Sequence, residues 1–339
     1  MNRFGTSFRL SIFGESHGPA VGITLDGLPA GIPLAEADFE ADLARRRGGT
    51  RGTTPRREAD RPQLLSGLYA GRTTGAPLTI LFANDDTRSG DYADLTHHYR
   101  PSHADRVAAV KFDGCNDPRG GGHFSARLTV GLVAAGVVAK KLLPAGLRFD
   151  TRLVAVGGET DPARFEETIA AARADGDSVG GIVECRIEGV PCGWGEPFFD
   201  SVESLAAHLL FAIPAVKGVE FGDGFAVAAR RGSANNDPIL DAAGTTATNH
   251  AGGIDGGIAN GNPIVVRVAV KPTPSIARPQ QTYDAATGCL EELRIRGRHD
   301  ACVALRGAVA VEAAMAVVLA DLYLRIPSTP CRPAPSSAD

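Results

Sequence analysis

Aromatic side chains and net charge are both scarce in this sequence. Phe, Trp and Tyr make up 6% of the 339 residues, and 35 Lys and Arg against 39 Asp and Glu leave a formal charge of −4. A chain this close to neutral has no global field that would attract nucleic acid or a membrane surface. We therefore expect neither partner. The 41 glycines and the many alanines indicate closely packed helices of small residues instead.

The cysteines lack the spacing of a zinc or redox motif. The six are at positions 115, 185, 192, 289, 302 and 331, and none forms a CxxC pair. This usage is typical of reduced thiols in a cytosolic protein, so we expect a cytoplasmic location. Three histidines lie between positions 97 and 103, but no carboxylate or cysteine completes a recognisable ligand set with them. We therefore predict no metal site.

Long apolar runs are missing as well. The run over 128–143 is short and interrupted by Gly and Lys, which argues against a membrane span. The first residues, Met-Asn-Arg-Phe-Gly, lack the apolar stretch of a signal peptide. Without a clear linker or repeat, we predict one domain over residues 1–326. The Pro- and Ser-rich segment 327–339 is predicted to be a disordered tail.

The most informative stretch is Gly-Gly-Gly-His-Phe-Ser-Ala-Arg at positions 120–127, followed by a small, apolar segment up to Lys140. Glycines allow the backbone to come close to a ligand. The first N–H groups of a helix and its dipole then favour an anion. The stretch therefore indicates either an anion site that opens a buried helix or a tight turn before a core helix.

Six arginines with no acid between them occupy positions 45–57. The run leaves a predicted helix and crosses Gly-Gly-Thr and Gly-Thr-Thr, which are typical of loops. Arginines on such a loop suit bidentate binding of phosphate or carboxylate. An anionic ligand is favoured over a solvated basic face. Nucleic acid is disfavoured, because the run lacks the interleaved aromatic residues that bind bases.

Hydrophobic periodicity predicts many strands that do not alternate regularly with helices, which disfavours a parallel sheet. Ser102 and Asp105 resemble a capping box, which places His103 in the first turn of a short helix and lowers its pKa. Strands are predicted over 7–13, 21–25, 64–69, 77–83, 147–156, 181–190, 217–228 (as a hairpin) and 263–270. Helices are predicted over 33–44, 163–172, 201–213 (with Ser201 as N-cap) and 306–324.

An ordered set of short blocks resembles the chorismate synthase family over residues 4–324. Each block is weak alone, but the ordered set is highly specific. The blocks include Phe-Gly-Glu-Ser-His-Gly at 13–18, Asp-Leu-Ala-Arg-Arg-Arg at 42–47, Thr-Thr-Pro-Arg-Arg-Glu at 53–58, Arg-Pro-Ser-His-Ala-Asp at 100–105, Arg-Gly-Gly-Gly at 119–122, Lys-Pro-Thr at 271–273 and Gly-Arg-His-Asp at 297–300.

The resemblance implies an α+β fold of the β-α-β sandwich type, in which antiparallel sheets enclose a layer of helices, assembled as a homotetramer. It implies a lyase that converts 5-enolpyruvylshikimate 3-phosphate to chorismate and phosphate by anti-1,4-elimination. The family requires reduced FMN although the reaction has no net redox change. NADPH or a separate flavin reductase would supply the electrons.

The resemblance also implies site residues by position. His17 is expected to protonate the leaving phosphate, and His103 and Asp300 to act near the flavin, with Ser16 and Ser125 in supporting hydrogen bonds. The FMN-contacting positions are His123, Phe124, Ser125, Pro214, Ala215, Gly256, Lys271, Pro272, Thr273, Pro274, Ser275 and Arg298. Arg45, Arg46, Arg51 and Arg127 are expected to meet the substrate's anions, and Arg46 and Arg51 match positions assigned to NADPH in the family.

Several positions depart from the commonest family pattern. Gly48 stands where Pro is usual, and His123 and Leu128 stand where Arg and Glu are frequent. A neutral histidine weakens the contact that an arginine would make with the flavin. One alternative is therefore a flavin- or phosphate-binding relative without turnover. A second, a hydrolase elbow of the G-x-S-x-G type at 14–18, is disfavoured because the preceding segment is too short for the sheet and oxyanion loop it needs.

Overall fold

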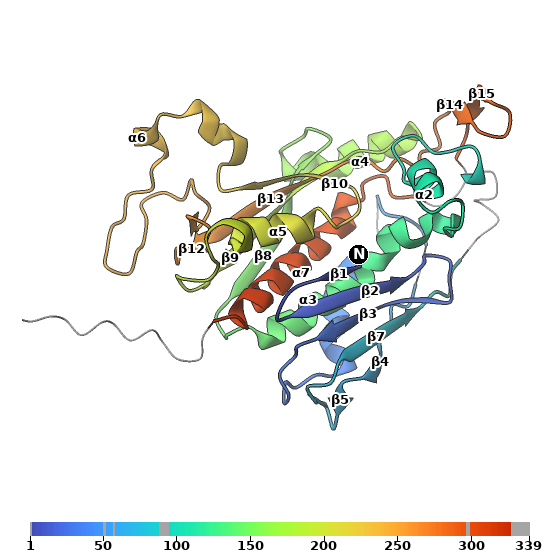
Figure 1. Ribbon diagram of the computed structural model, residues 1–339. Helices are drawn as coiled ribbons and strands as arrows, with labels where there is room; N and C mark the ends of the chain where they lie inside the picture. The colour runs from blue at the N-terminus through green and yellow to red at the C-terminus, as the bar shows by residue number, and fades with distance from the viewer. Residues whose placement is uncertain (1, 50–51, 57, 88–94, 296–298, 327–339) are drawn as a thin grey trace, which may run out of the picture.

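Two antiparallel sheets enclose a layer of helices (Figure 1), which confirms the predicted α+β sandwich. The computed structural model describes residues 2–49, 52–56, 58–87, 95–295 and 299–326. The predicted tail at 327–339 lies outside these ranges, as do Arg51 and Arg298.

The first sheet presents a row of apolar side chains to the helices. Alternate residues of β3 and β7, such as Val21, Ile23 and Ile80, are completely buried, as expected for strands with one face on the core. Every neighbouring pair in this sheet is antiparallel. In spatial order the strands are β1 (Arg3–Phe4), β2 (Arg9–Gly14), β3 (Ala20–Asp26), β7 (Leu78–Ala83) and β4 (Gln63–Ser66).

The second sheet covers the other side of the helical layer. Val183, Cys185 and Val266 on its central strands are completely buried. Its pairs are also antiparallel, and β10 lies at one edge. In spatial order the strands are β10 (Val216–Phe221), β13 (Ile264–Val270), β9 (Gly181–Glu188) and β8 (Arg148–Val156).

Two long helices of small residues, α3 (Thr129–Leu142) and α7 (Ala304–Tyr323), lie side by side between the sheets (Figure 1). Their close approach depends on Gly136, because a Cβ at that position would lie 2.4 Å from Cβ of Ala313. The predicted buried helix of small residues is therefore confirmed. A shorter helix, α1 (Glu40–Arg46), packs against both.

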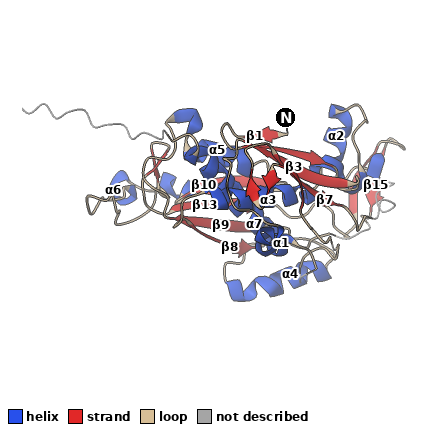
Figure 2. Ribbon diagram, turned by 90° about the horizontal axis from the view of Figure 1, so that it is seen from below, coloured by secondary structure: helices blue, strands red, loops and turns tan. Residues whose placement is uncertain are grey.

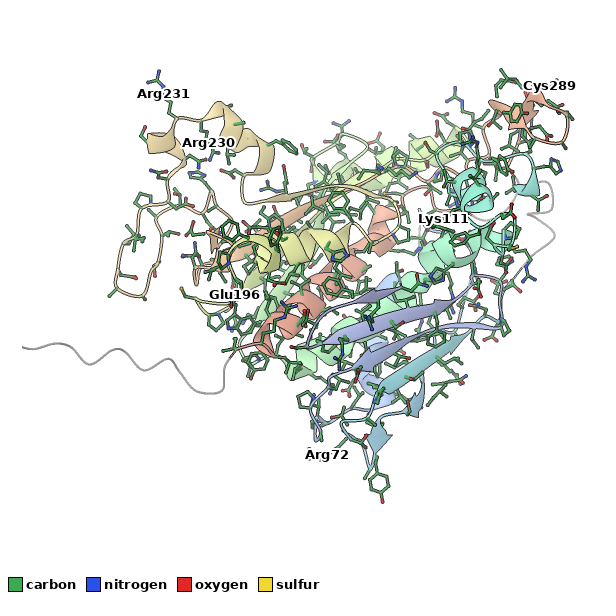
Figure 3. All side chains as sticks on the ribbon, in the orientation of Figure 1. Arg72, Lys111, Glu196, Arg230, Arg231 and Cys289 are labelled. Carbon is green, nitrogen blue, oxygen red and sulfur yellow. The ribbon has the colours of Figure 1, made fainter. Side chains whose placement is uncertain are left out.

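The remaining elements surround this sandwich. The helix α5 (Val202–Leu210) packs on α7 and β10, and α4 (Phe165–Ala174) lies at the periphery next to β8 (Figure 2). The segment between β10 and β13 projects from the molecule, with Arg231 pointing outward (Figure 3). The minor elements are α2 (Asp105–Lys111), α6 (Gly232–Asn235) and the hairpins β5–β6 (Leu68–Tyr69, Arg72–Thr73), β11–β12 (Ile254–Asp255, Ile258–Ala259) and β14–β15 (Gln280–Asp284, Cys289–Leu293).

Most predicted elements are confirmed within a few residues, including the N-cap at Ser201, whose side chain accepts from the Ser204 amide. The hairpin predicted over 217–228 is wrong, because β10 is followed by a 3-10 helix at Gly224–Ala229. The β14–β15 hairpin was not predicted. Within the described residues, no helix is both long and apolar enough to cross a membrane.

A buried aspartate at the end of α7 holds the N-terminal segment in place. Asp321 is completely buried and accepts hydrogen bonds from the amides of Thr6, Ser7 and Phe8 at 2.6–3.2 Å. Arg325, four residues later and just beyond the end of the helix, pairs with the same carboxylate. The carboxylate therefore joins the two ends of the described chain.

We expect Asp321→Ala to lower the free energy of unfolding by roughly 3 kcal/mol, because it leaves buried amides and one arginine without their acceptor. Urea denaturation followed by circular dichroism measures the loss. The matched control is Asp26→Ala, whose carboxylate forms a surface pair with Arg9 and should contribute less than about 1 kcal/mol. Equal losses in the two variants would contradict this role of Asp321.

Candidate active site

A cavity of about 790 Å³ lies at the N-terminal ends of α3 and α7. Its wall joins segments that are far apart in the sequence. The predicted site residues that line it are Ser16, Arg46, His103, His123, Phe124, Ser125, Arg127, Pro214, Ala215, Lys271, Thr273, Pro274, Ser275 and Asp300. The structure thus brings most of the predicted residues together in one place.

Some predicted residues lie elsewhere. Arg45 is directed to α7, where its guanidinium donates to the Glu312 carboxylate at 2.9 and 2.7 Å. Gly256 lies in the turn between β11 and β12, and Pro272 is exposed outside the cavity wall. Arg45 therefore serves the packing of α1 on α7 in this structure.

The three consecutive glycines allow two histidines to approach the same backbone segment. Gly120, Gly121 and Gly122 all have positive φ angles, of 59°, 82° and 52°. A Cβ on Gly120 would lie 2.4 Å from Cδ2 of His17, and one on Gly121 would lie 3.4 Å from Cε1 of His103. Conformation thus favours glycine at all three positions, and space also requires it at Gly120. His17 is not part of the lining, but its ring lies next to Gly120, which is.

A hydrogen-bonded chain orients Ser16 beside His17. Ser16 is buried, and its Oγ accepts a hydrogen bond from Nη1 of Arg56 at 3.0 Å. Arg56 is in turn held by Glu58, with Nε and Nη2 at 2.9 and 2.6 Å from Oε1. Sequence reasoning counted Arg56 in the basic run but assigned it no role. The signal was the carboxylate two positions later.

A second chain orients His103. Its Nδ1 lies 2.6 Å from Oδ1 of Asp105, and Arg100 donates to both oxygens of that carboxylate at 2.7 Å. Arg100 also donates to Oγ of Ser275 at 3.0 Å. Because the Nδ1–H group donates a hydrogen bond to the carboxylate, Nε2 is the nitrogen that remains for other partners.

The electrostatics of this chain favour an ionised Asp105 and a neutral His103. Burial lowers the pKa of His103, and the hydrogen bond that His103 donates to Asp105 opposes that shift only in part. Burial alone would raise the pKa of Asp105, but the hydrogen bonds from Arg100 and His103 outweigh it and hold that pKa well below its usual range. The predicted direction for His103 is confirmed, but its predicted cause is wrong. His103 precedes α2, and Ser102 has a positive φ of 57° and makes no cap.

Arg46 and Arg127 share one buried carboxylate, that of Asp60. Arg46 also donates to Oγ1 of Thr129 at 3.1 Å and to two carbonyls of the segment that precedes α3. Arg127 also donates through Nε to Asn84 Oδ1 and through Nη2 to the Ala83 carbonyl, both at 2.9 Å. The pair contributes positive charge to the cavity wall, while its hydrogen bonds hold the glycine segment.

Burial lowers the pKa of Arg46 to about 9. The carboxylate of Asp60 opposes this shift, and the charge of Arg127 adds to it. The guanidinium still carries its charge at pH 7.

Asp300 is buried just before the start of α7, and both of its carboxylate oxygens accept hydrogen bonds. Its Oδ1 accepts from the Thr54 amide and from Nε of Arg306, each at 2.9 Å, and Oδ2 accepts from Nη2 of Arg306 at 2.6 Å. Arg306 lines the cavity and was not predicted. Its position six residues after Asp300 carried no motif that would have revealed it.

His123 and Thr273 present polar atoms to the cavity. Nδ1 of His123 donates to the Gly14 carbonyl at 2.8 Å, which leaves Nε2 as its other ring nitrogen. Oγ1 of Thr273 is buried without a hydrogen-bond partner among the described residues. Such an atom is free to bond a ligand. Among all the residues that the structure describes, no three His, Cys, Asp or Glu side chains are grouped so that they could hold a metal ion.

The departure at Gly48 has a structural reason. A Cβ at this position would lie 2.7 Å from the Thr54 carbonyl oxygen and 2.8 Å from that of Arg56. The chain at 52–56 therefore folds back onto Gly48 too closely for a larger residue. This contact places Arg56 and Thr54 at the cavity.

Comparison with known proteins gives a consistent result. The sequence model of the family described as chorismate synthase matches residues 8–324. A chorismate synthase of Chitinophaga pinensis is 57% identical over 324 residues, covering 96% of this chain and 97% of that protein. One of Opitutus terrae is 44% identical, covering 96% and 97%. A solved structure titled "Crystal Structure of Chorismate Synthase" superimposes with a TM-score of 0.72 at 28% identity, covering 95% of this chain and 93% of that one.

We expect the His103 side chain to titrate below its ordinary pKa of about 6.5, so that it is neutral at pH 7. Asp105→Asn should lower that pKa further, because it removes the negative charge that favours the imidazolium. NMR titration of histidine-labelled protein measures both values. The matched control is Asp284→Asn, which removes the partner 3.0 Å from His97 and should leave His103 unchanged. A His103 pKa that rises in Asp105→Asn would contradict this account.

Proposed function

The chain belongs to the chorismate synthase family and is a lyase of the shikimate pathway that converts 5-enolpyruvylshikimate 3-phosphate to chorismate and phosphate, and we propose that the cavity at the starts of α3 and α7 is its active site. The observation that carries this proposal is the position of His17 and His103 against the same three glycines. Two proton-transfer groups thus flank one backbone segment.

We assign reduced FMN to this cavity as the cofactor. The volume of about 790 Å³ suits a flavin together with a small substrate. The unpartnered Thr273 Oγ1 fits a polar atom of the flavin, and the partly exposed Phe124 fits its ring system. When bound, reduced FMN would lend electron density to the substrate as phosphate leaves and take up the hydrogen from C6. The residues that would hold it are His123, Phe124, Ser125, Pro214, Ala215, Lys271, Thr273, Pro274 and Ser275.

Departure of the phosphate needs a proton and positive charge. We assign the proton to His17, with Ser16 fixed beside it by Arg56. Arg46 and Arg127 would supply positive charge from the wall, because most of their N–H donors are already bound within the protein.

On the cofactor side we assign three residues. His103 would accept a proton at Nε2 and return it, since the proton of its neutral ring is on Nδ1, bound to Asp105. Asp300 would accept or orient a proton with a carboxylate that Arg306 and the Thr54 amide keep in place. Ser125 would contribute a supporting hydroxyl.

The same contacts bear on the source of electrons. To bind NADPH, Arg46 would need N–H donors that it already gives to Thr129 and to two backbone carbonyls. We therefore favour a separate flavin reductase as the partner over NADPH bound at this arginine.

We also propose the homotetramer that the family resemblance implies. Phe198, Phe199 and Phe225 are 83%, 90% and 86% exposed, and large apolar side chains exposed in this way are typical of subunit interfaces. Light scattering coupled to size-exclusion chromatography measures the assembly.

The described cysteines carry free thiols, which fits the cytoplasmic location expected from the sequence.

An anaerobic assay with photoreduced FMN and 5-enolpyruvylshikimate 3-phosphate tests the function. With reduced FMN, we expect chorismate, measured by its absorbance, and phosphate to form in equal amounts. With oxidised FMN, we expect no turnover. NADPH in darkness should support turnover only after a flavin reductase is added. Tight FMN binding without chorismate would instead identify a binding-only relative.

We expect His17→Ala and His103→Ala each to lower turnover by about 100-fold or more, the range of general acid–base catalysis, while FMN still binds. The matched control is His97→Ala, a histidine bound to Asp284 on the β14–β15 hairpin. The control should retain the wild-type rate in the same assay. Near-wild-type rates in either active-site variant would remove its assigned role.

A further inference from the structure

Lys217 occupies a bulge at the edge of the second sheet. In the pairing of β10 with β13, Val216 lies opposite Val270 and Gly218 opposite Ala269, so Lys217 is the extra residue between them. A bulge re-aims the side chain of the extra residue, and bulges are common beside active sites. Here the side chain of Lys217 lines the cavity.

The backbone just before the bulge is strained as well. Ala215 has a positive φ of 76°, a conformation that costs a residue with a Cβ of order 1 kcal/mol or more. Its carbonyl accepts the Lys271 amide at 2.9 Å, which joins this turn to the segment after β13. The strained turn and the bulge together bring Lys217 next to Lys271 at one side of the cavity.

The two lysines form a local excess of positive charge. Within the described residues, the side chain of Lys217 has no ion pair or hydrogen bond, and Nζ of Lys271 donates to the carbonyl of Ser102. The cavity arginines differ, because Arg56, Arg100 and Arg306 each pair with a carboxylate. Burial lowers the pKa of Lys271, and the nearby charge of Lys217 lowers it further. A bound anion would relieve this repulsion.

We propose that Lys217, together with Lys271, binds the phosphate monoester of a cavity ligand. The inference rests on the proposed function, since it presupposes that flavin and substrate occupy this cavity. A phosphate monoester carries close to two negative charges at pH 7 and can bridge two ammonium groups. The flavin and the substrate each carry one such group, and binding measurements distinguish the two sources.

The experiment compares Lys217→Met with wild-type protein in binding of FMN and of riboflavin, which lacks the phosphate, and in the KM for the substrate at saturating reduced FMN. A roughly tenfold weaker FMN Kd with an unchanged riboflavin Kd assigns the flavin phosphate. That factor corresponds to about 1.4 kcal/mol. A roughly tenfold higher KM with an unchanged FMN Kd assigns the substrate phosphate. In either case Lys217→Arg should recover most of the loss.

The matched control is Lys141→Met, which removes a lysine of α3 that pairs with Asp38 at 2.8 Å and does not line the cavity. It should match the wild type throughout. An active Lys217→Met variant with all three constants within twofold of wild type would overturn the inference and leave the proposed function intact. Equal weakening of FMN and riboflavin would also overturn it, because the effect would not depend on phosphate. A wild type that binds no flavin and forms no chorismate would overturn the proposed function and this inference together.

Discussion

The site depends on a constraint that only glycine satisfies, namely three consecutive left-handed residues with histidines against them. With any Cβ at Gly120, the ring of His17 would have to move, and a side chain at Gly122 would meet the Asp117 carbonyl oxygen at 2.0 Å. Left-handed backbone is unfavourable for other residues and must be held in place by its surroundings. Arg46 holds the end of the segment through the carbonyls at 126 and 127, and the Ser16 amide donates to the Gly122 carbonyl at 3.0 Å.

The helical layer explains why this segment and Asp300 meet. The helices α3 and α7 can approach closely only where small residues face each other, as Gly136 faces Ala313. Each helix begins at the cavity, so the glycine segment before α3 and Asp300 before α7 arrive at the same place. A larger residue at Gly136 would separate the helices and, with them, the two halves of the site. The packing of small residues in the core therefore also determines the geometry of the site.

Local sequence predicted the fold where one signal dominated. The alternation in β3 and the small apolar residues of α3 each have one reasonable structure, and both were confirmed. The prediction failed where a side chain had competing partners. Asp105 could have capped a helix, but it binds Arg100 and His103 instead, which places His103 before α2. The pairings of Arg46 with Asp60 and of Asp300 with Arg306 depend on tertiary contact and left no pattern in the sequence.

The carboxylates near the cavity also explain how so many arginines can be gathered there. Guanidinium groups that are crowded in a buried wall repel one another and lose their hydration. Burying them without a partner of opposite charge therefore costs free energy. Glu58, Asp60, Asp105 and Asp300 each bind at least one arginine, so that the cations are fixed in orientation before any ligand arrives. Fixed charges need not reorganise when negative charge develops on a departing group, and this preorganisation is a main source of catalysis. Lysines on flexible stems, such as Lys217, can instead follow the ligand as it enters.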